Sequence, residues 1–340
     1  MTGVILFFAG TLTLAGVYAA LAQILNLSAG WGGLWDLGMA GTVGIAAYVY
    51  TVATVSPSEF PNLDVALGLP IPVGIALSAV VTGLVALLIG IPSLRLRGEY
   101  FLITTFAFAE VVRQLMINQS SLTGGTVGLN RLDRPFEDAV TGGNYRYVLL
   151  AITFAVVVAL YFFMRRLGRS PFGALLRSQR DNEPLAKALG KDVVRYRVLT
   201  FALAGVLVGL VAPLYVWYLK RVVPDLFAAD LTFTVWTALV IGGIGSFRGP
   251  AIGAVFLICL TEALQFLQVD AEHAVLLATM RPLLLGLVLI LVLRLRPEGL
   301  FTERRAFQRR TSPRTAPLAV QRAALASSPA AMDTSEGSGS

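Results

Sequence analysis

The feature that most constrains the fold is a series of apolar runs that follow one another with few polar breaks. A transmembrane helix needs about 20 consecutive and predominantly apolar residues. Only 14% of the 340 residues are charged, whereas a soluble domain usually carries about 25%. We therefore predict an all-α polytopic membrane protein with about nine transmembrane helices, within a range of eight to ten. The predicted spans cover residues 4–25, 37–55, 71–91, 100–117, 147–164, 198–219, 231–244, 252–267 and 276–293.

Some of these runs and breaks allow more than one interpretation. Residues 26–36 are predicted to form a short break, because glycines interrupt the apolar pattern there. The runs at 37–55 and 231–244 are weak and rich in glycine, so they could be re-entrant or broken helices, which would leave seven or eight full crossings. Non-helical backbone at membrane depth is tolerated only where it is buried in protein or lines a wet cavity.

The long polar stretch over residues 165–197 orients the chain. It holds nine basic residues against three acidic ones, and an excess of Lys and Arg beside membrane spans marks the cytoplasmic side. Counting spans from this loop places the N-terminus outside the cell and the C-terminus in the cytoplasm. Lys220 and Arg221 are the exception, because they then fall in an outer loop.

The net charge of +7 is concentrated in this loop and in the C-terminal tail. It indicates membrane orientation and contact with anionic lipid, not affinity for nucleic acid. We predict a transmembrane domain over residues 1–297 and a cytoplasmic tail over residues 298–340. From about residue 311 the tail is rich in Ser, Pro, Ala and Gly, a composition that predicts disorder.

Two short helices are predicted inside the 165–197 loop. Residues 174–177 favour helix after Pro171 and Gly173. A second helix should begin near Asn182 and Glu183, because Pro184 is well tolerated in the first turn, and Gly190 should end it. Two interpretations stand beside each other: a solvated loop that only fixes topology, or a docking element for a cytoplasmic partner protein.

Ionisable residues also occur within the predicted spans. Glu110 and Arg113 are three residues apart, so they share a helical face and can pair. Glu262 and Gln265 form a similar polar patch on the 252–267 span. Charged groups in a membrane usually face a bundle interior or a wet cavity. We slightly favour an interhelix pair near the outer interface over the lining of a transport path.

A glycine-dense segment spans residues 239–254. A phosphate-binding loop would need Gly-x-x-x-x-Gly-Lys-Ser/Thr, and no such match occurs in the chain. Small residues spaced four apart let membrane helices approach closely, so we favour helix packing over a chemical role. The residues concerned are Gly242, Gly243, Gly245, Gly249 and Gly253.

The sequence gives little support for an enzymatic function. His273 is the single histidine and Cys259 the single cysteine, so the usual His- or Cys-rich metal site cannot be assembled. No catalytic motif, metal site or cofactor site is predicted, and the chain is predicted not to be an enzyme.

Three sequence blocks, in this order and spacing, resemble a known family. They resemble the permease subunits of branched-chain amino acid ABC importers, specifically the M-type membrane subunit, over roughly residues 30 to 300. The first block comprises residues 94–101, 108–113 and 121–125; the second comprises 172–177, 182–183, 188–190 and 195–196; the third comprises 242–246, 249–250 and 253–254.

The resemblance implies a multi-pass protein of the bacterial inner membrane that pairs with a second, homologous permease. It also implies two cytoplasmic ATP-binding subunits, which would hydrolyse ATP, and a periplasmic or lipid-anchored protein that delivers the substrate. The second block resembles the loop that docks on the ATPase. It therefore assigns the coupling role to Arg177, Asn182, Glu183, Ala188, Leu189 and Gly190.

Departures from the family pattern bear on the substrate. Pro184 stands where an aliphatic residue is frequent, and residues 126–129 differ from the commonest pattern. Members of the family also carry urea, short amides or aromatic acids, so these are the alternative substrates. A less favoured alternative is an ion-driven secondary transporter, which would favour acidic or histidine relays in mid-membrane.

Overall fold

The computed structural model describes residues 2–57, 65–93, 98–130, 132–137 and 144–266, and isolated positions between 283 and 301. The chain divides into two compact units, Met1–Glu303 and Arg304–Ser340. The second unit lies outside the described residues, as do the predicted disorder of the tail and most of the predicted ninth span. The fold described here is that of the first unit.

Helices account for nearly all of the regular structure in the described ranges. Among the residues that the structure describes, six segments are long and apolar enough to cross a membrane, and two shorter apolar helices, Met39–Thr54 and Gly249–Ala263, accompany them. The chain is therefore an all-α polytopic membrane protein, and eight of the predicted spans coincide with these helices. The elements are α1 (Thr2–Leu25), η1 (Asn26–Trp31), α2 (Met39–Thr54), α3 (Ile71–Ser93), α4 (Gly98–Asn118), α5 (Ser120–Thr123), β1 (Leu129–Asn130), α6 (Tyr145–Arg169), α7 (Pro171–Asp181), α8 (Glu183–Ala188), α9 (Val193–Leu219), β2 (Arg221–Val222), η3 (Pro224–Phe227), α10 (Ala229–Gly242) and α11 (Gly249–Phe266).

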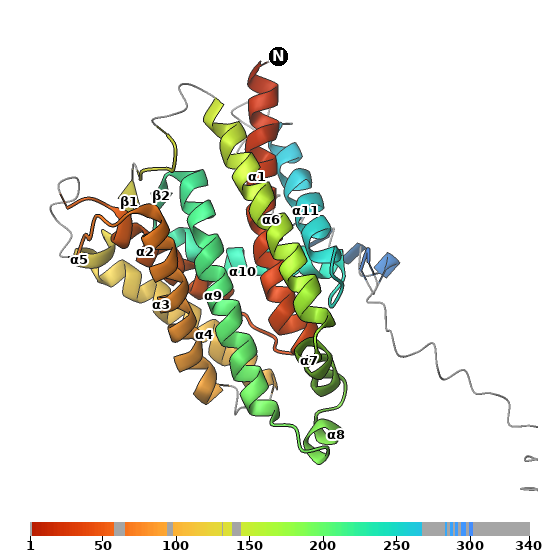
Figure 1. Ribbon diagram of the computed structural model, residues 1–340. Helices are drawn as coiled ribbons and strands as arrows, with labels where there is room; N and C mark the ends of the chain where they lie inside the picture. Colours follow the sequence, from red (N-terminus) through yellow and green to blue (C-terminus); the bar gives the residue numbers. More distant parts are fainter. Residues whose placement is uncertain are drawn as a thin grey trace, which may run out of the picture. The chain divides into compact units, whose positions relative to one another are not determined.

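Helix α9 lies at the centre of the bundle. In an apolar 18-residue stretch of this span 67% of the residues are buried, whereas the share is 22% in the corresponding stretch of α6. It packs against α3 at very short range, because a Cβ atom on Gly209 would lie 2.5 Å from the Cα atom of Ala79. On the other side α1 packs against both α6 and α11 (Figure 1).

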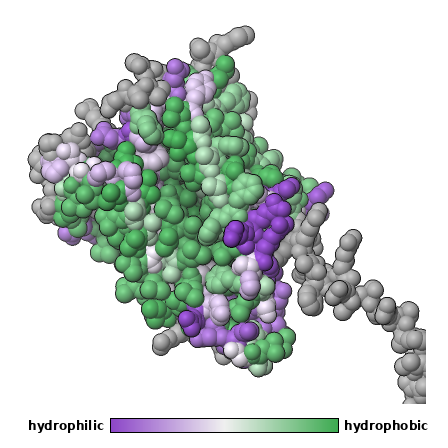
Figure 2. Space-filling view, viewed as in Figure 1, coloured by the Kyte–Doolittle hydropathy of each residue, from purple (hydrophilic) through white to green (hydrophobic). Residues whose placement is uncertain are grey.

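The surface of the bundle matches a lipid environment. Figure 2 shows apolar side chains over the flanks of the long helices, with hydrophilic side chains gathered mainly toward the ends. Leu84 and Leu88 on α3 and Phe154 on α6 are 59%, 73% and 68% exposed. Apolar exposure on this scale is unusual for a water-soluble surface and marks contact with lipid or protein partners.

The predicted break over residues 26–36 is wrong in its first half. Helix α1 continues directly into η1, a π-helical turn that ends at Trp31. Asn26 and Ser28 are 3% and 1% exposed, and both make internal hydrogen bonds. These polar residues are therefore buried and bonded inside the protein, so their polarity does not mark a loop.

A small antiparallel sheet adds to the predicted helices. Strands β1 and β2 pair with Leu129 opposite Val222 and Asn130 opposite Arg221. Beside it, Lys220 forms an ion pair with Glu137. The Glu137 carboxylate therefore offsets the positive charge of Lys220, which was an exception to the rule that basic residues lie on the cytoplasmic side.

Candidate functional site

Both short helices predicted in the 165–197 loop are present, and local signals explain their ends. The Ser170 hydroxyl accepts a hydrogen bond from the Gly173 N–H at 3.4 Å, and Pro171 opens α7. The Asn182 side chain accepts from the Leu185 N–H at 3.0 Å and so caps α8. Gly190 follows α8 with φ = +75°, a conformation that glycine adopts with little strain.

Glu183, predicted as a docking residue, is engaged within the chain. Its carboxylate lies 2.8 Å from Lys187 Nζ and 2.7 Å from Arg197 Nη2. The hydrogen bond from Lys187, together with that from Arg197, lowers the pKa of Glu183 although partial burial opposes the shift. Since Arg197 belongs to α9, these pairs fix the orientation of α8 relative to that span.

The apolar side chains of α8 and of the residue after it are buried in part and exposed in part. Ala186 is 2% exposed, whereas Leu185 and Leu189 are 55% and 67% exposed. The two leucines are four residues apart and so lie on one side of the helix. They form a small apolar surface at the end of the molecule where α7 and α8 lie in Figure 1.

The basic residues of α7 contact the ends of neighbouring spans. Arg177, a predicted coupling residue, donates to the Gly168 carbonyl at 2.6 Å, near the end of α6. Arg180 donates to the Gly30 carbonyl in η1. Leu176 and Gln179 on the same helix are 0% and 1% exposed. Helix α7 is thus seated against the membrane-spanning bundle along one face.

The η1 turn in turn contacts the glycine-rich segment between α10 and α11. The Asn26 side chain accepts from the Gly245 N–H at 2.7 Å and donates to the Ser246 carbonyl at 2.9 Å. The Trp31 indole donates to the Gly245 carbonyl at 3.0 Å. We call Asn26, Trp31 and residues 243–247 the buried joint. Sequence reasoning missed Asn26 and Trp31, because their partners lie more than 200 residues away.

The five predicted packing glycines lie in and beside this joint. A Cβ atom on Gly242 would lie 2.0 Å from the Gly249 carbonyl oxygen, and one on Gly253 would lie 2.2 Å from that of Ala238. No side chain fits at such distances, so α10 and α11 are in backbone contact. Gly243 and Gly245 adopt φ = +109° and +84° in the turn.

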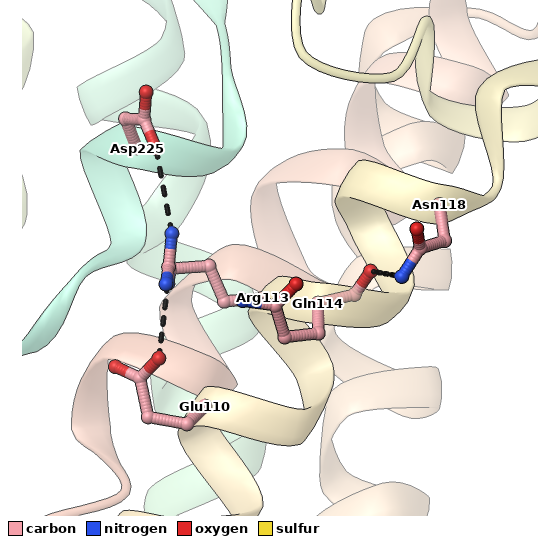
Figure 3. Close-up of polar contacts among 5 residues, drawn as sticks. All are labelled: Glu110, Arg113, Gln114, Asn118 and Asp225. Atoms are coloured by element: carbon pink, nitrogen blue, oxygen red, sulfur yellow. Dashed lines mark hydrogen bonds and ion pairs between the residues drawn. The ribbon is translucent and has the colours of Figure 1, made fainter.

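The predicted Glu110–Arg113 pair exists and extends further than expected. Arg113 Nε lies 3.1 Å from Glu110 Oε2, and Arg113 Nη1 lies 3.5 Å from Asp225 Oδ1 in η3 (Figure 3). Asp225 is far from Arg113 in sequence, so spacing could not reveal it. Arg113 thereby connects α4 to the segment that precedes α10. Glu262 lies elsewhere, on α11, which packs against α1 and α10.

Asp36 is a buried acid that the sequence analysis did not single out. It is 4% exposed, and its carboxylate accepts from the Gly38 N–H at 2.7 Å. Its backbone carbonyl accepts from the Trp236 indole at 2.8 Å. It lines a small cavity with Ser28 and Thr42. The sequence did offer one signal that could have identified Asp36: it is an acidic residue in a glycine-rich break and has no basic residue beside it.

These features define the class of the protein as a polytopic helical membrane protein with a helical loop against one end of the bundle. Among the described residues no group of three or more His, Cys, Asp or Glu side chains could hold a metal ion. Residues 7–293 match the family described as "Branched-chain amino acid transport system / permease component", and the chain belongs to this family. The resemblance inferred from the sequence blocks is thus confirmed.

Individual relatives agree with this family. The chain is 26% identical to the probable branched-chain amino acid transport permease protein LivM of Methanocaldococcus jannaschii, over 85% of this chain and 91% of the relative. It is 27% identical to the high-affinity branched-chain amino acid transport system permease protein LivM of Salmonella typhimurium, over 85% and 68%. A shorter match, 29% identical over 36% of this chain, is to the probable permease protein LivH of M. jannaschii. No solved structure matches the chain.

Proposed function

We propose that this chain is the M-type permease subunit of an ABC importer that carries branched-chain amino acids across a bacterial inner membrane. The observation that carries the proposal is the family match over residues 7–293. The names of the LivM relatives supply the substrate class. Membership of an ABC importer implies that ATP hydrolysis supplies the energy, and we assign that hydrolysis to separate subunits, because this sequence has no phosphate-binding loop motif.

The exposed leucines of α8 support a docking role for the loop. Leu185 and Leu189 offer an apolar contact, while Glu183 and Asn182 hold α8 in place beneath it. In this proposal two cytoplasmic ATP-binding subunits contact the loop region of this chain and of a second, LivH-like permease. The α7–α8 end then faces the cytoplasm, and the N-terminus lies outside.

Transport requires the bundle to alternate between two arrangements. ATP binding can shift that equilibrium only if the ATPases bind the loop differently in the two states. Contacts of α7 with Gly168 and Gly30 connect the loop to α6 and η1. We assign Glu110, Arg113 and Asp225 a structural role: their ion pairs keep η3 in contact with α4 during these changes. We assign no part in these ion pairs to Glu262.

Reconstitution tests the function directly. The chain is co-expressed with its sister permease, the ATPase subunits and the binding protein, and the complex is placed in proteoliposomes. ATP-dependent uptake of labelled leucine, isoleucine and valine is expected. Uptake of urea, short amides or aromatic acids instead would move the substrate to the alternative class. Uptake by the purified chain alone, without ATP, would contradict the importer.

A further inference from the structure

The buried joint connects parts of the chain that have different neighbours. Its η1 side continues from the end of α1, and its residues 243–247 belong to the turn that joins α10 to α11. Three hydrogen bonds between 2.7 and 3.0 Å hold the two sides together. Phe247 also packs edge-on against the Trp31 ring, with centroids 5.4 Å apart. Any displacement of η1 must therefore either carry the turn along or break these bonds.

Helix α7 bears directly on the same turn of η1. Arg180 donates to the Gly30 carbonyl, and its side-chain carbons lie so close to Gly33 that a Cβ there would be 2.9 Å away. At the end of α6, a Cβ on Gly168 would lie 2.5 Å from the Phe247 ring and 2.9 Å from the Trp31 ring. The loop helix, η1 and the turn are thus in continuous contact.

Residues Asn26–Trp31 form a π-helical turn, to which an α-helical turn is the ordinary alternative. π-helical turns occur mostly as single turns within α-helices, often at functional sites. Moving the extra residue out of the turn would shift the register by one residue, which rotates side chains by about 100° in a helix of 3.6 residues per turn. Asn26 and Trp31 could not keep their bonds to residues 245 and 246 after such a rotation. The three hydrogen bonds of the joint therefore depend on the π-helical register of η1.

We propose that Asn26 is a positioning residue for transport, through which a movement of α7 reaches α10 and α11. This inference rests on the proposed function, since it assumes that α7 moves with the ATPase subunits. Asn26 suits the role because its amide holds both a donor and an acceptor of the turn. Trp236 on α10 extends the connection to the irregular segment at Asp36, whose carbonyl accepts from its indole.

Gln23 provides a matched control on the same helix. It lies three residues before Asn26 and is 2% exposed, yet neither of its amide atoms has a hydrogen-bond partner in the described part of the chain. Asn26→Leu removes both bonds to the turn with little change in size. Asn26→Asp keeps the acceptor for the Gly245 N–H and loses the donor to Ser246. Gln23→Leu removes a buried amide without breaking a bond to the turn.

The test compares uptake and ATP hydrolysis in the same proteoliposomes containing the full importer. Asn26→Leu is expected to keep hydrolysing ATP while uptake per ATP falls about tenfold, within the usual range of coupling between sites. For Asn26→Asp the uptake per ATP should fall by less than for Asn26→Leu. For Gln23→Leu it should equal that of the wild type. Co-purification of the ATPase subunits with each variant confirms that docking is intact.

Each other outcome has a defined meaning. An unchanged ratio for Asn26→Leu, or an equal loss for Gln23→Leu, overturns the inference. If Asn26→Leu fails to assemble, Asn26→Asp decides alone; if neither assembles, Asn26 is a folding residue and the inference is overturned as well. A wild-type complex without ATP-dependent uptake refutes the proposed function instead, which separates the two failures.

Discussion

Two polar regions flank α7, and they differ in their access to water. At α8 the ion pairs of Glu183 involve side chains that are 34%, 56% and 17% exposed for Glu183, Lys187 and Arg197. In the buried joint Asn26 and Trp31 are 3% and 1% exposed and carry no charge. Exposed pairs are worth about 0–1 kcal/mol, whereas a buried group left without its partner costs about 1–3 kcal/mol.

This difference separates two tasks. The charged α8 region orients a surface helix and leaves Leu185 and Leu189 accessible, so small changes there should alter partner binding more than folding. The neutral joint fixes how α1, α10 and α11 meet, so changes there should alter the bundle itself. The more conspicuous charges in the sequence thus belong to the region with the smaller contribution to the fold.

The largest effect on stability is expected from Gly242→Ala beside the joint. The new Cβ would lie 2.0 Å from the Gly249 carbonyl oxygen, so α10 and α11 must separate. Overpacking typically costs about 1–3 kcal/mol and occasionally more, and a backbone clash belongs at the upper end. Thermal unfolding of the detergent-purified protein measures the loss.

Gly190→Ala is the matched glycine control at α8. Nothing lies within 4 Å of its Cβ position, and only its φ of +75° opposes the change. The cost should be about 1–2 kcal/mol. If the two alanine variants lose equal stability, the contrast between the regions is wrong.

The double variant Glu183→Arg with Gly190→Ala should affect transport more than insertion. It places a third positive charge beside Lys187 and Arg197 and strains the end of α8. We expect a several-fold loss of ATP-dependent uptake with normal amounts of protein in the membrane. Uptake and immunoblotting of the same membranes provide the comparison, and normal uptake would count against docking through this loop.

Asp36 extends the comparison of exposed and buried polar groups, because it is a buried acid that is hydrogen-bonded to the backbone. Asp36→Leu leaves the Gly38 N–H without its 2.7 Å acceptor and should cost about 1–3 kcal/mol. Asp36→Asn retains an acceptor oxygen of the same shape and should lose less. Unfolding of both variants in detergent checks the order, and a reversed order would show that burial of the Asn amide costs more than its hydrogen bond with the Gly38 N–H contributes.

The smallest expected effect is the pH dependence of the Glu183 pairs. The pKa of Glu183 is lowered from its ordinary value of 4.5 by its hydrogen bonds with Lys187 and Arg197. The carboxylate therefore contributes stability above pH 4.5, and this contribution is lost as the pH falls through the lower folded-state pKa. The melting temperature of the wild type should exceed that of Glu183→Gln at pH 7, and the two should converge on acidification. If the difference in melting temperature between the wild type and Glu183→Gln stays constant with pH, the ion pairs of Glu183 do not cause it.

Sequence reasoning recovered whatever local signals encode. Capping by Asn182 and the stop at Gly190 gave the two loop helices, and the spacing of three gave the Glu110–Arg113 pair. It failed where the partner is remote: Asp225 is 112 residues from Arg113, and the partner of Asn26 is 219 residues away. The η1 turn was read as part of a loop for the same reason.

By itself the sequence determined that this chain crosses a membrane as a bundle of helices, because apolar length and the need to satisfy every backbone group in lipid leave no other solution. It also determined the family, through blocks of residues whose order and spacing are specific. Only the tertiary structure decided which polar residues are buried and bonded, which glycines lie in backbone contact, and which leucines stay exposed. Those properties depend on the approach of segments that are distant in the chain, and no periodic pattern within one segment can encode them.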